Sequence, residues 1–195
     1  SLDNWHTIAK QLALSHQVYI LDQRNHGRSP HTKEINYELL AQDVFDFCTQ
    51  HELHSINLIG HSMGGKVAML FALLYPTLVN KLIVVDIAPA FYDGGHEDIL
   101  FAMAEAPLKM ATKRDEIDLF LHRRIPEFGV RQFILKNLSR DENNKFVWKC
   151  NFESLITHYR LLMDFPTLST TFLNHTYFIK GEFSNYLNQD NFDTC

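Results

Sequence analysis

The sequence predicts an α/β fold, in which a doubly wound and mostly parallel sheet carries an inserted helical cap. Three observations support this prediction. Short apolar, β-branched runs at residues 55–59, 82–86 and 176–180 alternate with stretches of helical periodicity, as in parallel sheets joined by crossover helices. A tight turn at residues 60–64 joins the first of these runs to a helix. Residues 92–165 have helical periodicity without strand patterns, which indicates an insertion.

The length and composition are those of a globular domain. With 195 residues, 46% of them hydrophobic, the chain can bury a sizeable core in one domain. Its 23 acidic and 18 basic side chains give a net charge of -5 without any long run of one sign. This charge pattern does not indicate a nucleic-acid-binding surface, so we expect no nucleic-acid partner.

The three cysteines, Cys48, Cys150 and Cys195, are far apart and lack metal-ligand spacing. An odd number of isolated thiols is typical of a reducing compartment and not of a disulfide framework. No apolar run approaches the roughly 20 residues that cross a bilayer. Residue 1 is not Met, so a targeting segment can precede it. We therefore expect a protein without a membrane span, in the cytoplasm or, in a eukaryote, in the mitochondrial matrix.

The first thirty residues predict a helix, a strand and a polar loop. Apolar side chains at three- and four-residue spacing predict an amphipathic helix within residues 2–13 that lays one face on a sheet. A buried strand is predicted at Gln17–Leu21, and the loop Asp22–Pro30 follows at its carboxyl end, where open α/β sheets bind ligands. His26 lies in this loop, and we expect it to support the turn described next and not to act as a base.

The turn at residues 60–64 is the most informative stretch of the chain. A second amphipathic helix over residues 37–48 leads through a strand into the pattern Gly-x-Ser-x-Gly, formed by Gly60, Ser62 and Gly64. A serine in a strained strand-to-helix turn needs neighbours without side chains, because a Cβ there would collide with the strand or the helix. This arrangement is a nucleophile elbow, and it predicts Ser62 as a nucleophile.

Two further groups are predicted to lie beside Ser62. The N–H of Met63 begins the next helix, where it has no intrahelical acceptor and favours an anionic oxygen, as in an oxyanion hole. The elbow helix descends about 18 Å over about twelve residues, and the strand at 82–86 climbs back about 17 Å. Asp86, at the end of that strand, therefore returns to the level of Ser62.

The rest of the chain divides into the insertion and a return to the sheet. We expect residues 1–91 to form the first part of the core, residues 92–165 a helical cap, and residues 166–195 the remainder of the core. In the last segment, Thr176–Lys180 is predicted as a strand that breaks at Gly181.

The segments Leu21–Ser29, Gly60–Lys66 and Val85–Pro89 together resemble one branch of the α/β-hydrolase superfamily, the YbfF-type esterases and their eukaryotic mitochondrial relatives. The resemblance covers nearly the whole chain. Ser1–Trp5 is similar to the segment just after that family's His-Gly-x-x-Gly loop, and Gly181–Tyr186 is similar to its strand-seven loop.

This resemblance implies an α/β-hydrolase fold with the cap inserted after strand six. It also implies a serine hydrolase that cleaves small or medium acyl esters or thioesters through an acyl-Ser62 intermediate, with Met63 as one oxyanion donor. The family's glycine loop falls before residue 1 and its catalytic histidine beyond residue 195, so we expect a chain incomplete at both ends and inactive by itself. We expect no cofactor and no metal.

The acid of the triad has three candidates. Asp86 at the end of strand six is favoured, although a strand-end carboxylate can also simply cap the following turn. Glu182, in the loop after the last strand, and Glu153, in the cap, are the alternatives. Because the chain lacks the family's histidine, the alternative function is a non-catalytic binding module of the same fold.

Overall fold

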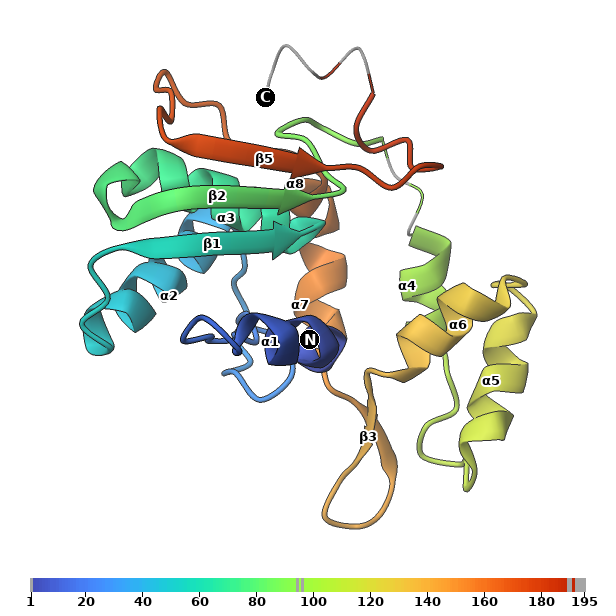
Figure 1. The fold of residues 1–195 in the computed structure, drawn as a ribbon. Helices are drawn as coiled ribbons and strands as arrows, with labels where there is room; N and C mark the ends of the chain where they lie inside the picture. The colour runs from blue at the N-terminus through green and yellow to red at the C-terminus, as the bar shows by residue number, and fades with distance from the viewer. Residues whose placement is uncertain (1, 94, 96, 189–190, 192–195) are drawn as a thin grey trace. The chain divides into compact units, whose positions relative to one another are not determined.

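The computed structural model of the chain describes residues 2–93, 95, 97–188 and 191, and Cys195 lies outside these residues. Figure 1 shows the order of the elements. The helices are α1 His6–Leu12, α2 Tyr37–Gln50, α3 Met63–Leu74, α4 Glu97–Ala104, α5 Arg114–His122, α6 Phe128–Leu135, α7 Phe152–Thr157 and α8 Tyr159–Met163. The strands are β1 Ile56–His61, β2 Val79–Val85, β3 Leu138–Arg140, β4 Phe146–Trp148 and β5 His175–Ile179.

The chain forms two compact units. The insertion unit comprises Ser1–Glu34 and Gly94–Thr157, and the sheet unit comprises Ile35–Asp93 and His158–Cys195. The predicted division into core segments and a cap at residues 92–165 remains a prediction. In the described part of the chain, no helix has both the length and the apolar character needed to cross a lipid bilayer.

The sheet unit is built on three parallel strands in the order β1-β2-β5. The register pairs Ile59 with Ile83 and Ile83 with Tyr177. The predicted strands near residues 55–59, 82–86 and 176–180, and their parallel pairing, are thereby confirmed.

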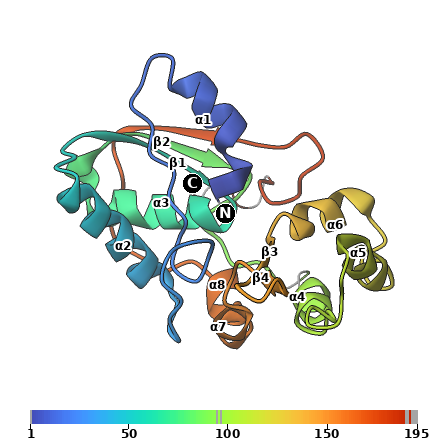
Figure 2. The ribbon, with the colours of Figure 1, turned by 90° about the horizontal axis from the view of Figure 1, so that it is seen from below.

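Two helices cover one face of this sheet. The helix α3 packs on β1 and β2, and α2 packs on α3. Figure 2 shows both helices on the same side of the strands. The core between them includes Leu70 and Phe71 of α3 and Leu82 and Val84 of β2, all of them buried. Because α3 is apolar over most of its circumference, it can be buried on nearly every side.

The helix α2 confirms the amphipathic pattern at residues 37–48. Its N-cap is Asn36, whose Oδ1 accepts a hydrogen bond from the Leu39 N–H at 2.7 Å, satisfying one donor of the first turn. The buried side chains lie at helical spacing, as an apolar stripe requires. They are Tyr37, Leu40, Ala41, Val44 and Cys48.

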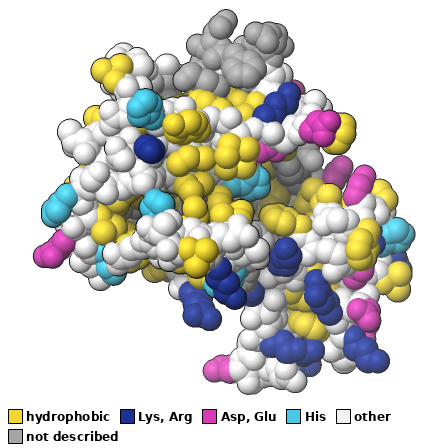
Figure 3. All heavy atoms as spheres, in the orientation of Figure 1, with side chains coloured by type: hydrophobic (Ala, Val, Ile, Leu, Met, Phe, Trp, Pro, Cys, Tyr) yellow, Lys and Arg dark blue, Asp and Glu magenta, His cyan; other side chains and the backbone are white. Residues whose placement is uncertain are grey.

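The opposite face of the sheet is also apolar. Side chains alternate along a strand, so Ile83 and Val85 point away from α3 when Val84 is buried beneath it. The register places Tyr177 and Ile179 on the same face, where they are 53% and 52% exposed. Figure 3 shows hydrophobic side chains gathered over these strands.

The insertion unit has its own hydrophobic core. Helices α5 and α6 pack on each other and bury apolar side chains such as Ile117 and Ile134. Buried Arg131 joins the two helices, because its Nε lies 2.7 Å from Asp118 Oδ1 and its Nη1 donates to the Ile125 and Pro126 carbonyls.

Two predictions for the N-terminal segment are wrong. The predicted helix within residues 2–13 forms as a short 3-10 turn followed by α1, but α1 buries none of its residues. The predicted buried strand at Gln17–Leu21 is not a strand, and Tyr19 and Leu21 are exposed. A strand exists only through hydrogen bonds to a neighbour, and no described strand pairs with these residues.

The insertion was predicted to lack strands, and this is also wrong. Strands β3 and β4 form an antiparallel hairpin. Its turn is stabilised locally, since Asp141 Oδ1 accepts from the N–H groups of Asn143 and Lys145 at 2.9 and 2.8 Å. Asn144 takes a φ of 59°, which asparagine tolerates better than most residues. The polar run 141–144 was a turn signal that helical periodicity on either side obscured.

Candidate active site

Ser62 lies in a strained turn between a strand and a helix. The strand β1 ends at His61 and α3 begins at Met63, so Ser62 alone makes the reversal, with φ 53° and ψ -125°. Such a positive φ is costly for a residue with a Cβ and persists only where its surroundings impose it. The Ser62 N–H donates to the Val85 carbonyl at 3.0 Å, and the Ser62 carbonyl accepts from the Gly65 N–H at 2.8 Å.

Glycines allow the strand and the helix to meet at backbone distance. A Cβ on Gly60 would lie 2.1 Å from the Gly64 carbonyl oxygen and 2.7 Å from the Gly65 Cα. A Cβ on Gly65 would lie 2.5 Å from a methyl group of Ile87. The steric reason given for the Gly-x-Ser-x-Gly pattern is therefore observed at Gly60, and Gly65, just after the pattern, is confined in the same way.

Met63 is the first residue of α3. Its N–H belongs to the first helical turn, where backbone N–H groups have no intrahelical acceptor and the helix dipole favours negative charge. The position suits a donor to an anionic oxygen formed beside Ser62. The oxyanion role of Met63 remains a prediction.

Asp86 lies level with Ser62. The register of β1 and β2 pairs His61 with Val85, the last residues of these two adjacent parallel strands. Ser62 and Asp86 are the residues that directly follow them. The prediction that the two strand ends reach the same level is confirmed. Like Ser62, Asp86 has a positive φ, 56°, and so leaves its strand in a sharp turn.

Two hydrogen bonds join Asp86 to the strand on its other side, β5, and to the loop that follows β5. Its N–H donates to the Ile179 carbonyl of β5 at 2.8 Å, and its Oδ1 accepts from the Gly181 N–H at 3.1 Å. Its charge also acts on a neighbour. Burial lowers the pKa of His61, and the negative charge of Asp86 opposes that shift. The role of Asp86 as triad acid remains a prediction.

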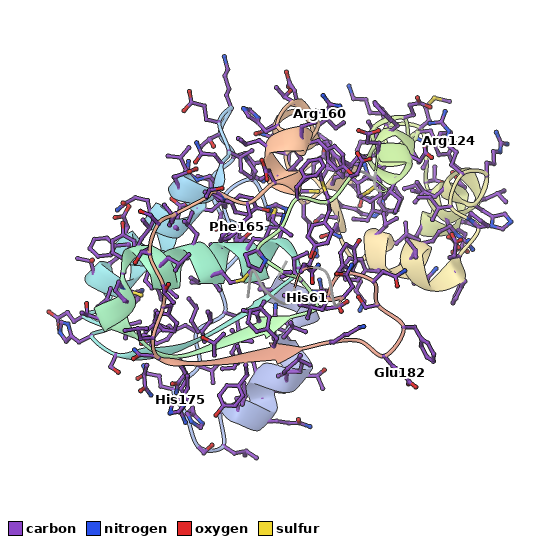
Figure 4. The ribbon with its side chains drawn as sticks, turned by 90° about the horizontal axis from the view of Figure 1, so that it is seen from above. His61, Arg124, Arg160, Phe165, His175 and Glu182 are labelled. Carbon is purple, nitrogen blue, oxygen red and sulfur yellow. The ribbon has the colours of Figure 1, made fainter. Side chains whose placement is uncertain are left out.

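The alternative acids occupy different places. Glu182 lies on the loop beyond β5 with an exposed side chain (Figure 4). Glu153 lies in the first turn of α7, in the insertion unit, and is also exposed. Neither glutamate follows directly on a strand next to β1, as Asp86 does.

His26 lies in the insertion unit, whereas Ser62 and Asp86 lie in the sheet unit. There it forms an isolated antiparallel bridge with Cys150, and its Nδ1 lies 3.0 Å from the Arg24 carbonyl oxygen. Burial is the main cause of its lowered pKa, and the hydrogen bond to Arg24 opposes that shift.

Lys66, four residues after Ser62, was not predicted to have a role. Its side chain is almost completely buried, and its Nζ donates to the carbonyls of Met163 and Asp164, both at 2.8 Å. These carbonyls lie at the end of α8, where a helix favours a cation. Burial lowers the pKa of Lys66 to about 8, although the negative charge of Asp164 opposes the shift.

Tyr92 was missed as well. Its hydroxyl accepts from the Ala88 N–H at 2.8 Å and donates to the Tyr186 carbonyl at 2.6 Å. Its ring lies 4.8 Å from Lys66 Nζ. No motif in the sequence indicates these contacts, because Tyr186 is 94 positions from Tyr92.

Comparisons with known proteins agree with this geometry. A family model described as "alpha/beta hydrolase fold" matches residues 1–106. A Danio rerio protein named "sn-1-specific diacylglycerol lipase ABHD11" is 36% identical over 200 residues, which cover 98% of this chain and 63% of the relative. The Escherichia coli protein named "Esterase YbfF" is 34% identical over 160 residues, which cover 82% of this chain and 61% of the relative.

A solved structure described as "Marine microorganism esterase" matches with a TM-score of 0.96 and 40% identity, covering 99% of this chain and 77% of that one. The resemblance to the YbfF-type branch is confirmed by these matches. The chain spans 63% and 61% of the lengths of the two curated relatives described above.

Proposed function

Because the chain belongs to the α/β hydrolase fold family, we propose that the complete protein hydrolyses carboxylic esters or thioesters through an acyl-Ser62 intermediate. The observation that carries the proposal is the backbone at Ser62. A serine with φ 53° stands between β1 and α3, at the carboxyl end of a parallel sheet and level with Asp86. Esterase and lipase are also the activities in the names of the similar proteins.

In the proposed reaction, Ser62 Oγ attacks the carbonyl carbon of the substrate while a histidine takes the hydroxyl proton. The carbonyl oxygen becomes negative and accepts from the Met63 N–H. The histidine then gives its proton to the leaving alcohol or thiol. Water, activated by the same histidine, releases the acid from Ser62. By the family resemblance, this histidine lies beyond residue 195.

We propose Asp86 as the residue that orients this histidine. Its Oδ1 is already held by the Gly181 N–H, and a carboxylate has a second oxygen that can accept from an imidazole N–H. A fixed carboxylate keeps the imidazole in one tautomer and stabilises its charged form during the reaction. Asp86 is preferred to Glu182 because only Asp86 ends a strand paired directly with β1.

The substrate is proposed to be a small or medium acyl ester, with residues 92–165 forming the cap that limits acyl length. The name of the Danio rerio relative also suggests a glycerolipid ester. We further propose a reducing compartment, the cytoplasm or, in a eukaryote, the mitochondrial matrix. Cys48 and Cys150 are both free thiols, which fits such a compartment.

Two assays on the complete protein test this function. A fluorophosphonate probe should label wild type and leave Ser62→Ala unlabelled. A series of nitrophenyl esters of increasing acyl length, with a diacylglycerol as a separate arm, should then define the substrate. Equal labelling or equal hydrolysis by Ser62→Ala would refute the acyl-serine mechanism. A complete protein that is folded but neither labelled nor hydrolytic would support the binding-module alternative.

A further inference from the structure

The hydroxyl of Tyr92 joins two loops at the carboxyl end of the sheet. The N–H that it accepts from belongs to Ala88, a fully buried residue two positions after Asp86. The carbonyl to which it donates belongs to Tyr186, in the loop after β5. Both bonds are short, at 2.8 and 2.6 Å, and the two tyrosine rings meet edge to face with centroids 5.2 Å apart.

The same two loops also hold the carboxylate of Asp86. Its Oδ1 accepts from the Gly181 N–H, five residues before Tyr186. The direction of the carboxylate therefore depends on how far apart the two loops lie. The Tyr92 hydroxyl bridges these loops, through the Ala88 N–H two residues after Asp86 and through the Tyr186 carbonyl.

Tyr92 is itself anchored to α3, the helix that begins directly after Ser62. Its ring lies 4.8 Å from the Nζ of Lys66, which stands one turn into α3, in cation–π geometry. Its N–H donates to the Met163 carbonyl at 3.0 Å, the same oxygen that accepts from Lys66. One side chain thus contacts the nucleophile's helix and both loops that flank the acid.

We propose that Tyr92 is a positioning residue, whose hydroxyl sets the direction of the Asp86 carboxylate relative to Ser62. The inference rests on the proposed serine-hydrolase function, and it adds a residue outside the triad. In this proposal Tyr92 needs no contact with the substrate or the reacting atoms. It acts through Asp86, so its effect falls on kcat and requires an intact carboxylate at position 86.

The test uses Tyr92→Phe in the complete protein, with Tyr37→Phe as a matched control. Tyr37 is buried, its hydroxyl donates to the Leu162 carbonyl at 2.6 Å, and its ring lies 5.8 Å from Lys66 Nζ. The control therefore removes the same group near the same lysine, without touching the loops at Asp86. Tyr92→Phe should lower kcat about tenfold or more with KM within about twofold, because small misplacements of a catalytic group reduce the rate strongly. Tyr37→Phe should keep kcat within about twofold of wild type.

A double-mutant cycle with Asp86→Asn separates positioning from a general structural effect. In the Asp86→Asn background, Tyr92→Phe should lower kcat by less than about twofold, because the group through which it acts is gone. An equal loss in both backgrounds, or a folded Tyr92→Phe with wild-type kcat, would overturn the inference. If Tyr92→Phe does not fold, Tyr92→His enters the same cycle with the same two outcomes. Ser62→Ala is assayed in parallel, since residual turnover there would refute the proposed function itself, whereas the Tyr92 variants test only the positioning role within that function.

Discussion

Replacing Lys66 with methionine should change how the stability of the complete protein depends on pH. The Lys66 side chain is only 2% exposed, and burial lowers its pKa from 10.5 to about 8. A lysine whose pKa is lower in the folded state binds fewer protons there than in the unfolded chain between the two values. The contribution of Lys66 to the free energy of unfolding should therefore rise as the pH increases from 8 towards 10.5. The neutral amine can still donate to the Met163 and Asp164 carbonyls.

The size of this effect follows from the two pKa values. Each unit of difference corresponds to about 1.4 kcal/mol. Between pH 7 and pH 10, a lysine that titrates at about 8 when folded and 10.5 when unfolded adds about 2.5 kcal/mol to the free energy of unfolding. Methionine fills a similar volume and does not titrate, so Lys66→Met lacks this contribution.

The measurement is urea unfolding of wild type and Lys66→Met at pH 7, 8, 9 and 10. Subtracting the two curves removes the titration of every other group, including Tyr37, whose pKa is raised by burial. Wild type should gain about 2.5 kcal/mol relative to Lys66→Met over this range. Parallel curves, or a wild type that loses stability relative to Lys66→Met, would refute the conclusion that burial lowers the pKa of Lys66.

Three further predictions concern the site and the insertion unit. Ser62→Ala should keep the melting temperature within a few degrees and reduce ester hydrolysis below about one part in a thousand, measured against enzyme-free buffer. Asp86→Asn should lower kcat about a thousandfold, while Glu182→Gln stays within about twofold; the reverse ranking in the same ester assay would identify the other acid. Arg131→Ala should lower the free energy of unfolding by about 3 kcal/mol, because it leaves Asp118 and two carbonyls without their buried donor. Arg124→Ala, which removes an exposed ion pair with Glu105, should cost less than about 1 kcal/mol in the same urea titration; equal losses would contradict the burial argument.

The features that the sequence predicted correctly depend on short segments. The elbow at Ser62 needs only a strand, small residues and a helix in that order, and all three lie within residues 56–74. The level of Asp86 follows from the lengths of one helix and one strand, because both rise by fixed amounts per residue. Parallel pairing of β1, β2 and β5 follows from the helices between them.

The features that it missed depend on distant partners. Residues 17–21 have strand-forming composition, but a strand needs a neighbour, and the composition of five residues does not specify one. The contacts of Lys66 with Met163 and Asp164 join residues 97 and 98 positions apart. Neither partner offers a side-chain pattern, because the acceptors are backbone carbonyls that every residue has.

The backbone contact at Gly60 and Gly65 has a consequence for any mutational scan of this chain. A Cβ at either position would overlap atoms 2.1 to 2.5 Å away, so even alanine there should be lost from a library selected for activity. These two glycines would then show the same intolerance as Ser62, although they take no part in bond making. Intolerance in a growth selection therefore does not separate the proposed nucleophile from the glycines that leave room for it. A scan of this chain needs a second measurement, such as protein abundance beside fluorophosphonate labelling, in which we expect Ser62→Ala to stay abundant while Gly60→Ala and Gly65→Ala are depleted.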